Sequence, residues 1–149
     1  MALWQFDILF VPIGAGLPVV TDEGCRTEAI SPERCELAIR ILSAKLGPAA
    51  EMMDGWFVFG PEDGSRFDVL LEEETSGEVS ARVDAREQPE RFLELVCDLA
   101  ARLDCSIYAL EFGKFIESEP EALCQALVLS RAASFVRDPA KVLLGTSDA

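Results

Sequence analysis

Apolar and polar residues alternate along the N-terminal segment of the chain. The apolar side comprises Trp4, Phe6, Ile8 and Phe10, and the polar side includes Gln5 and Asp7. A period of two residues is typical of a strand with one buried face. The chain is therefore predicted to begin with a strand, which Gly14–Pro18 ends and which a loop to about Ile30 follows.

Three later segments place apolar residues at the three- and four-residue spacing of a helix. Ser31 and Pro32 supply an N-cap and a first-turn proline for the first of them, and Gly47 ends it. A second helix opens at Gln88–Pro89. A third runs from Ser118 to about Val136 behind a capping box.

Four further runs have the length and composition of strands: Gly55–Phe59, Arg66–Glu72, Glu78–Arg86 and Cys105–Phe112. The element order is then β-α-β-β-β-α-β-α. This order predicts a single α+β domain over residues 1–149, with an antiparallel sheet of about five strands and helices packed mainly on one face. The tail from about residue 139 is weakly specified.

The two central runs predict a hairpin whose register satisfies both faces of the sheet. Its loop is Glu73–Gly77. The predicted apolar pairs are Phe67 with Val83, Val69 with Ala81, and Leu71 with Val79. The predicted charged pairs are Arg66 with Asp84 and Asp68 with Arg82. Opposite charges across a ladder stabilise it by a few tenths of a kcal/mol, and a slip of one residue would expose the apolar face.

Charge narrows the choice of partner. The chain has 27 acidic and 13 basic residues and no histidine, for a formal charge of −14. Residues 51–98 carry −10 of this excess, from 14 acids and 4 bases. Such a chain repels phosphate backbones and anionic lipids, so neither nucleic acid nor a membrane is an expected partner. The expected partner is a basic protein domain. The chain itself is expected to be a monomer or a homodimer.

Catalytic and cofactor motifs are weak throughout the sequence. Gly14 and Gly16 lack the third glycine of a nucleotide-binding loop, and without histidine no Ser-His or Cys-His nucleophile can form. The five cysteines show no metal-ligand spacing, although Cys25 or Cys105 could be a reactive thiol. No cofactor, metal or catalytic residue is predicted. The N-terminus lacks the basic region of a signal peptide, so a cytoplasmic location is expected.

The charged and aromatic residues of the central region are the predicted partner-binding set: Trp56, Glu62, Asp63, Arg66, Asp68, Glu72, Glu73, Glu74, Arg82 and Asp84. Acidic side chains would steer a cationic protein and an aromatic ring would anchor it. Two other interpretations stay open. The arginines and aspartates are a structural ion-pair ladder, or Asp68, Asp84 and Tyr108 are the acids and bases of a carboxylate-dependent lyase or isomerase.

The chain resembles the immunity proteins that neutralise toxins in bacterial interbacterial systems. The resemblance covers its size, acidity and α+β pattern, and the runs Gly64–Val69 and Ala81–Arg86. It implies a binding protein that covers the active site of a basic toxin. A second similarity, over Ser31–Val136, is to type III secretion chaperones, which are also acidic but begin with their first helix; it implies binding to an effector segment.

Overall fold

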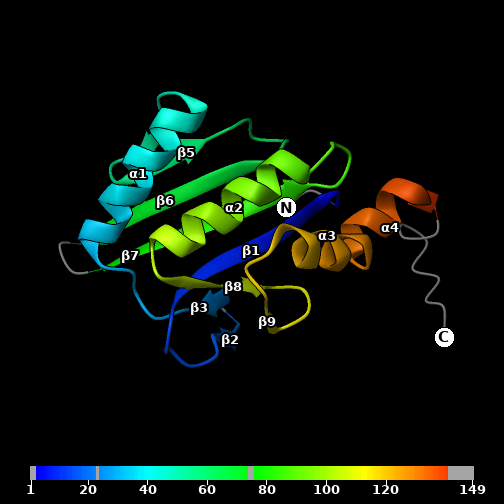
Figure 1. Cartoon of the computed structure of the whole chain (residues 1–149), viewed down its shortest axis with the longest axis horizontal. Coiled ribbons are helices and arrows are strands. Elements are labelled where there is room, and N and C mark those ends of the chain that lie inside the picture. The colour runs from blue at the N-terminus through cyan, green and yellow to red at the C-terminus, as the bar shows by residue number, and fades with distance from the viewer. Residues whose placement is uncertain (1–2, 23, 74–75, 141–149) are drawn as a thin grey trace.

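The α+β class is confirmed by a computed structural model, which describes residues 3–22, 24–73 and 76–140. These residues form one large antiparallel sheet, a small two-stranded sheet and four helices (Figure 1). The strands are β1 (Gln5–Pro12), β2 (Val19–Thr21), β3 (Gly24–Arg26), β4 (Ala50–Met53), β5 (Trp56–Phe59), β6 (Arg66–Glu73), β7 (Ser76–Asp84), β8 (Cys105–Ala109) and β9 (Lys114–Ile116). The helices are α1 (Pro32–Leu46), α2 (Glu90–Arg102), α3 (Pro120–Val128) and α4 (Arg131–Arg137).

The large sheet has seven strands in the order β4-β5-β6-β7-β1-β8-β9. The first strand of the chain therefore lies inside the sheet, paired with β7 on one side and β8 on the other. The prediction of about five strands was too low, because β4, β9 and the β2–β3 hairpin are only three or four residues long. Short, largely exposed strands have no buried face, so they leave no alternating pattern in the sequence.

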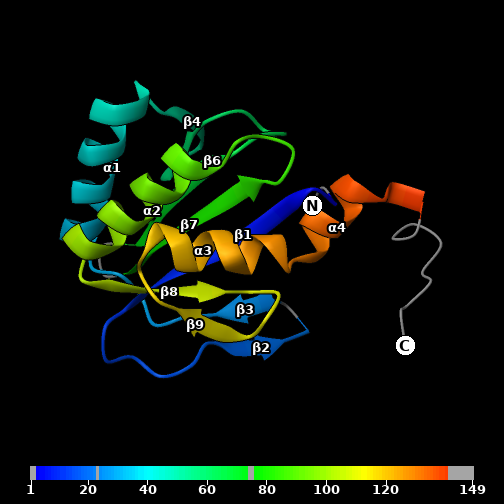
Figure 2. The same cartoon turned by 45° about the vertical axis from the view of Figure 1, so that its right-hand side comes forward.

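The core lies between the sheet and helices α1, α2 and α3, which occupy one side of it in both views (Figure 2). Phe6, Ile8 and Phe10 of β1 point into this core and are at most 2% exposed. The ring of Phe10 packs on Phe67 of β6, and Phe67 stacks on Phe92 of α2 with ring centroids 4.6 Å apart. The apolar side predicted for the first strand is thus the buried side from Phe6 to Phe10.

Helix boundaries follow the predicted signals for the first two helices. The Ser31 hydroxyl accepts a hydrogen bond from the Arg34 amide at 3.3 Å, and Gly47 ends α1 with φ at +90°. The predicted third helix was wrong in its length, since it is divided into α3 and α4. The buried hydroxyl of Ser130 accepts from the Ala133 amide and so starts a new helix at that point. Of the helices in the described ranges, none is long and apolar enough to traverse a lipid bilayer.

The predicted hairpin register was wrong by two residues. Phe67 lies opposite Ala81 and Val69 opposite Val79, and Arg66 faces Arg82. A slip of two keeps every side chain on its predicted face, so the apolar pattern cannot detect it. The hairpin is also longer than predicted, because Glu73 pairs with Ser76 after an irregularity in the ladder. The remaining predicted loop residues, 74 and 75, lie outside the described part.

Close packing at Gly77 fixes this register against α1. A Cβ atom at Gly77 would overlap the Cys35 sulfur and would lie 3.2 Å from the Leu70 carbonyl oxygen. The Gly77 carbonyl also accepts a hydrogen bond from the Ile30 amide at 2.9 Å. Only glycine leaves room for α1 to reach the sheet at this position.

We expect Gly77→Ala to lower the free energy of unfolding by about 1–3 kcal/mol, measured by urea denaturation, because the added methyl overpacks a filled site. Gly16→Ala is the matched control. A Cβ there has no neighbour within 4 Å, so its effect should stay within about 0.5 kcal/mol. The double variant Gly77→Ala/Cys35→Ala should lose less stability than the sum of the losses in the two single variants, because removing the sulfur makes room for the new methyl. Strict additivity would contradict the proposed overlap.

Candidate binding surface

One face of the sheet lies away from helices α1, α2 and α3, and we call it the open face. Cross-strand partners share a face, and one row of such partners crosses six strands: Val58, Asp68, Ser80, Leu9, Tyr108 and Phe115. The residues that alternate with this row, such as Ile8, Phe67 and Ile107, belong to the core, so the row points away from the side that the helices cover. Most of the predicted partner-binding residues belong to this open face.

Trp56, Arg66 and Asp68 form a connected polar group on the open face. The indole nitrogen of Trp56 donates to Asp68 Oδ2 at 2.9 Å, and Arg66 Nη2 donates to the same oxygen at 3.2 Å. Arg66 Nε also lies 3.0 Å from Asp68 Oδ1, which makes an ion pair. The Nε–H group makes no hydrogen bond to an atom of the described residues. The Arg66 side chain is only 9% exposed. The Asp68 carboxylate therefore fixes the ring of Trp56 and neutralises a buried guanidinium.

Asp7 of β1 joins the open face as the partner of Arg82. Arg82 Nε lies 3.3 Å from Asp7 Oδ1, so the predicted pairing of Arg82 with Asp68 was wrong. Burial raises the pKa of Asp7, and the Arg82 guanidinium partly offsets that effect. Asp7 also lines a cavity of about 220 Å³ together with Glu111 and Arg131. The sequence analysis missed Asp7 as a site residue, although its position on the polar side of the first strand was visible.

Asp84 is a structural residue. It is 2% exposed, its carboxylate accepts hydrogen bonds from the Arg86 guanidinium, and it lies opposite Gln5 rather than Arg66. Arg86 also donates to the Asp63 carbonyl at 2.8 Å and stacks 4.0 Å above the ring of Trp4. These contacts anchor the loop before β6 to the N-terminal end of β1. Asp84 is therefore not available to a partner.

An apolar patch bordered by carboxylates lies at the other end of β6. Met53, Trp56, Leu70 and Glu78 are successive partners across β4, β5, β6 and β7. Met53 is 69% exposed, and Trp56 and Leu70 are half-buried. The exposed Glu72 lies two residues beyond Leu70, on the same face. We call Met53, Trp56, Leu70, Glu72 and Glu78 the acidic-apolar patch.

The carboxylates of this patch repel each other. Partial desolvation raises the pKa of Glu78 although the side chain as a whole is exposed, and the charge of Glu72 raises it further. Burial also raises the pKa of the Cys25 thiol of β3, and the charge of Glu78 raises it further. Glu78 was absent from the predicted set. Its alternation with Ser80 and Arg82 on the polar side of the strand was the signal that could have found it.

The structure separates the predicted acids into two groups. Glu62 and Asp63 precede β6, whereas Glu72 lies six residues after Arg66, or about 20 Å along the strand. Glu73 is in β6, but its side chain lies outside the described part, and so does the whole of Glu74. The two groups of carboxylates therefore lie at opposite ends of the open face and do not form one cluster.

The three groups of the lyase hypothesis do not converge. Asp68 and Tyr108 lie in one row but three strands apart, so their backbones are about 14 Å from each other. Asp84 forms an ion pair with Arg86. Tyr108 is 4% exposed and packs edge-on against Phe115. Burial raises the pKa of the Cys105 thiol to about 11, which lowers its reactivity. Within the described ranges, no three His, Cys, Asp or Glu side chains are grouped to hold a metal ion.

No protein-family model, curated protein or solved structure matches the chain. Its function is therefore inferred from the chemistry of the open face.

We expect Glu78→Gln to raise the free energy of unfolding at pH 7 by a few tenths of a kcal/mol, measured from the urea midpoint, because it removes a partly desolvated carboxylate and its repulsion by Glu72. Glu78 stays largely exposed, so water screens the repulsion and keeps the gain small. An acid whose pKa is raised in the folded state weakens the fold when ionised, and the penalty disappears as the pH falls below that pKa. The gain should therefore shrink between pH 7 and pH 4.

Glu28→Gln, in the exposed segment before α1, is the control for the loss of one surface charge. It should leave the midpoint unchanged within error at both pH values, while Glu72→Gln should act in the same direction as Glu78→Gln. A lower midpoint for Glu78→Gln at pH 7 would show that the two carboxylates do not repel each other.

Proposed function

We propose that the chain is a non-enzymatic binding protein that inhibits a basic bacterial toxin by laying its open face over the toxin's active site. The observation that carries the proposal is the acidic-apolar patch, in which the exposed Met53 and the half-buried Trp56 and Leu70 lie beside Glu72 and Glu78. The patch combines an aromatic anchor and negative charge on one surface. The resemblance of the chain to immunity proteins supports the same function.

The two parts of the patch have different roles in the proposed complex. Carboxylates attract a cationic domain at long range and accelerate its association. Tryptophan is enriched among the few interface residues that hold most of the binding energy. Because Asp68 already fixes the ring of Trp56, little conformational freedom is lost when a partner covers it.

The secretion-chaperone hypothesis has weaker support. The segment Ser31–Val136 keeps a helix-first order, but β1 lies within its sheet between β7 and β8. A strand in that position is part of the fold and not an appendage to it. The proposed inhibitor needs no helix-first order, and Met53, Glu72 and Glu78 on the open face are exposed to a folded partner.

The proposal is tested by co-expressing the chain with the basic protein encoded by an adjacent reading frame. We expect that protein to arrest bacterial growth alone, and the chain to restore growth and to form a stoichiometric complex with it. Trp56→Ala should weaken the complex about 30-fold or more in calorimetry, which is typical of a central aromatic anchor. Glu72→Lys/Glu78→Lys should slow association and reduce rescue.

The control is Glu36→Lys/Glu121→Lys, which changes the charge by the same amount at exposed positions on α1 and α3. It should preserve both rescue and affinity, and circular dichroism should show that every variant is folded. The proposal fails if no adjacent product is a basic growth inhibitor, or if the open-face and control variants bind equally well.

A further inference from the structure

A groove separates α1 from α2 on the helix side of the sheet. It has a volume of about 760 Å³ and is lined by residues of the last turn of α1 and the first three turns of α2. Its apolar surface comes from Leu46, which is 46% exposed, and from Phe92 and Leu95, which are half-buried against the core. These side chains give the groove an apolar lining next to water.

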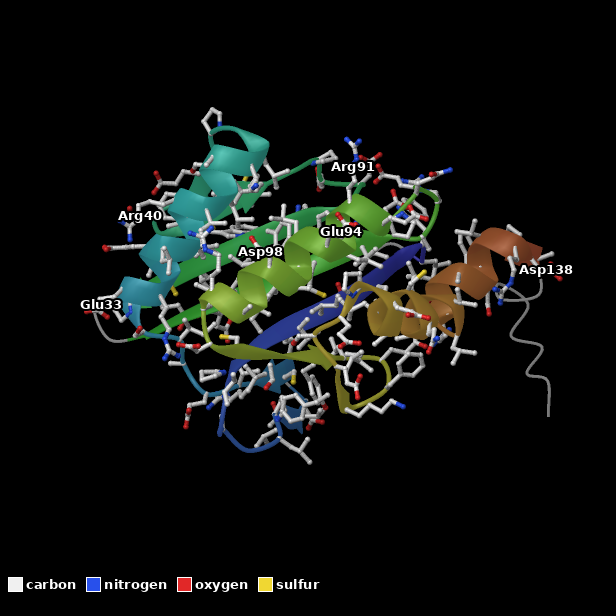
Figure 3. The ribbon with its side chains drawn as sticks, in the orientation of Figure 1. Glu33, Arg40, Arg91, Glu94, Asp98 and Asp138 are labelled. Atoms are coloured by element: carbon white, nitrogen blue, oxygen red, sulfur yellow. The ribbon has the colours of Figure 1, made fainter. Side chains whose placement is uncertain are left out.

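Charges in the groove are segregated by sign. The cations Lys45 and Arg91 come from the end of α1 and the start of α2, and the acids Glu94 and Asp98 follow along α2. Figure 3 shows Arg91, Glu94 and Asp98 in succession along the side of α2 that faces α1. Arg91 and Asp98 are separated by two turns, or about 10 Å along the axis.

A surface with a cationic end and an acidic end is complementary to itself when turned by 180°. If α2 of a second copy lies antiparallel to α2, Arg91 meets Asp98 of the second copy and Asp98 meets its Arg91. Glu94 and Leu95 then both lie near the two-fold axis, where Leu95 of each copy covers part of the apolar lining of the other. Such an isologous contact is the commonest way in which two identical chains associate. A strongly basic partner, in contrast, would meet Lys45 and Arg91 as well as Glu94 and Asp98, and so would gain no net charge attraction in the groove.

We propose that this groove is the interface of a two-fold symmetric homodimer, in which α2 packs antiparallel to α2 of a second copy and Arg91 pairs with its Asp98. The interface lies on the opposite side of the sheet from the open face. Both open faces therefore point outward, and the dimer presents two copies of the proposed toxin-binding surface. The inference stands on the groove alone and does not depend on the toxin.

Sedimentation equilibrium at 0.15 M salt tests the proposal, because screening at that ionic strength leaves mainly short-range charge pairs. Wild-type chain at tens of micromolar should have twice the 16.3 kDa mass of one copy. Arg91→Asp alone and Asp98→Arg alone should each raise the dimer dissociation constant at least about tenfold, since each places like charges at two symmetric contacts.

An equimolar mixture of the two single variants should recover the dimer. In the mixed pair, the new carboxylate at position 91 meets the new guanidinium at position 98, and the native Asp98 meets the native Arg91. Arg40→Asp is the matched control, because Figure 3 shows Arg40 on the side of α1 away from α2. It should leave the dissociation constant unchanged, and none of these variants should alter toxin neutralisation measured above the dissociation constant.

A wild-type chain that stays monomeric at 200 micromolar overturns the proposal and leaves the groove to a different protein. A dimer that both single reversals leave intact also overturns it, because the contact would then lie elsewhere. Failure of toxin binding without loss of the dimer would count against the proposed function only.

Discussion

The central position of β1 is the constraint on which the rest of the fold depends. β1 pairs with β7 through residues 5–9 and with β8 through residues 8–12, so it joins two parts of the sheet that have no other strand in common. The aromatic rings of β1 also contact both parts of the sheet. Phe10 packs on Phe67 of β6, and Phe6 packs on Phe112, which follows β8. Without β1, strands β4 to β7 and strands β8 and β9 would be separate sheets.

The charges of the open face depend on the same strand. Arg66 and Arg82 are direct partners, an arrangement that repulsion would disfavour in an isolated hairpin. Each has its own carboxylate, because Asp68 lies beside Arg66 and β1 brings Asp7 to Arg82. The like-charged pair is therefore tolerated only in the assembled sheet. The ion pairs are partly a consequence of topology and not only of hairpin register.

This dependence explains which parts of the structure the sequence could predict. Local signals placed α1 correctly, because Ser31, Pro32 and Gly47 act within their own turn of the chain. Alternation placed each long strand on the right face. The hairpin register was wrong since it was chosen to pair Arg66 with Asp84 and Asp68 with Arg82, when the deciding contacts come from β1 and from α1 at Gly77. Charge pairs chosen within the hairpin alone could not predict the contacts that β1 makes with β7, because β1 lies about 70 residues earlier in the chain.

The candidate site divides in the same way. The sequence predicted that Trp56, Arg66 and Asp68 share a region, but it also grouped Glu62 with Glu72, which lie at opposite ends of β6. The alternation of polar residues could have placed Glu78 on this face, but its proximity to Glu72 depends on the hairpin register, which the sequence analysis predicted wrongly. The charge of Glu72 raises the pKa of Glu78, and a cationic side chain placed between the two carboxylates would offset that effect. A basic partner would then stabilise the surface it binds, because a ligand that favours the folded state stabilises it by its own binding energy. The acidic-apolar patch is a place where local stability and binding are in conflict, and such conflicts are expected at functional surfaces.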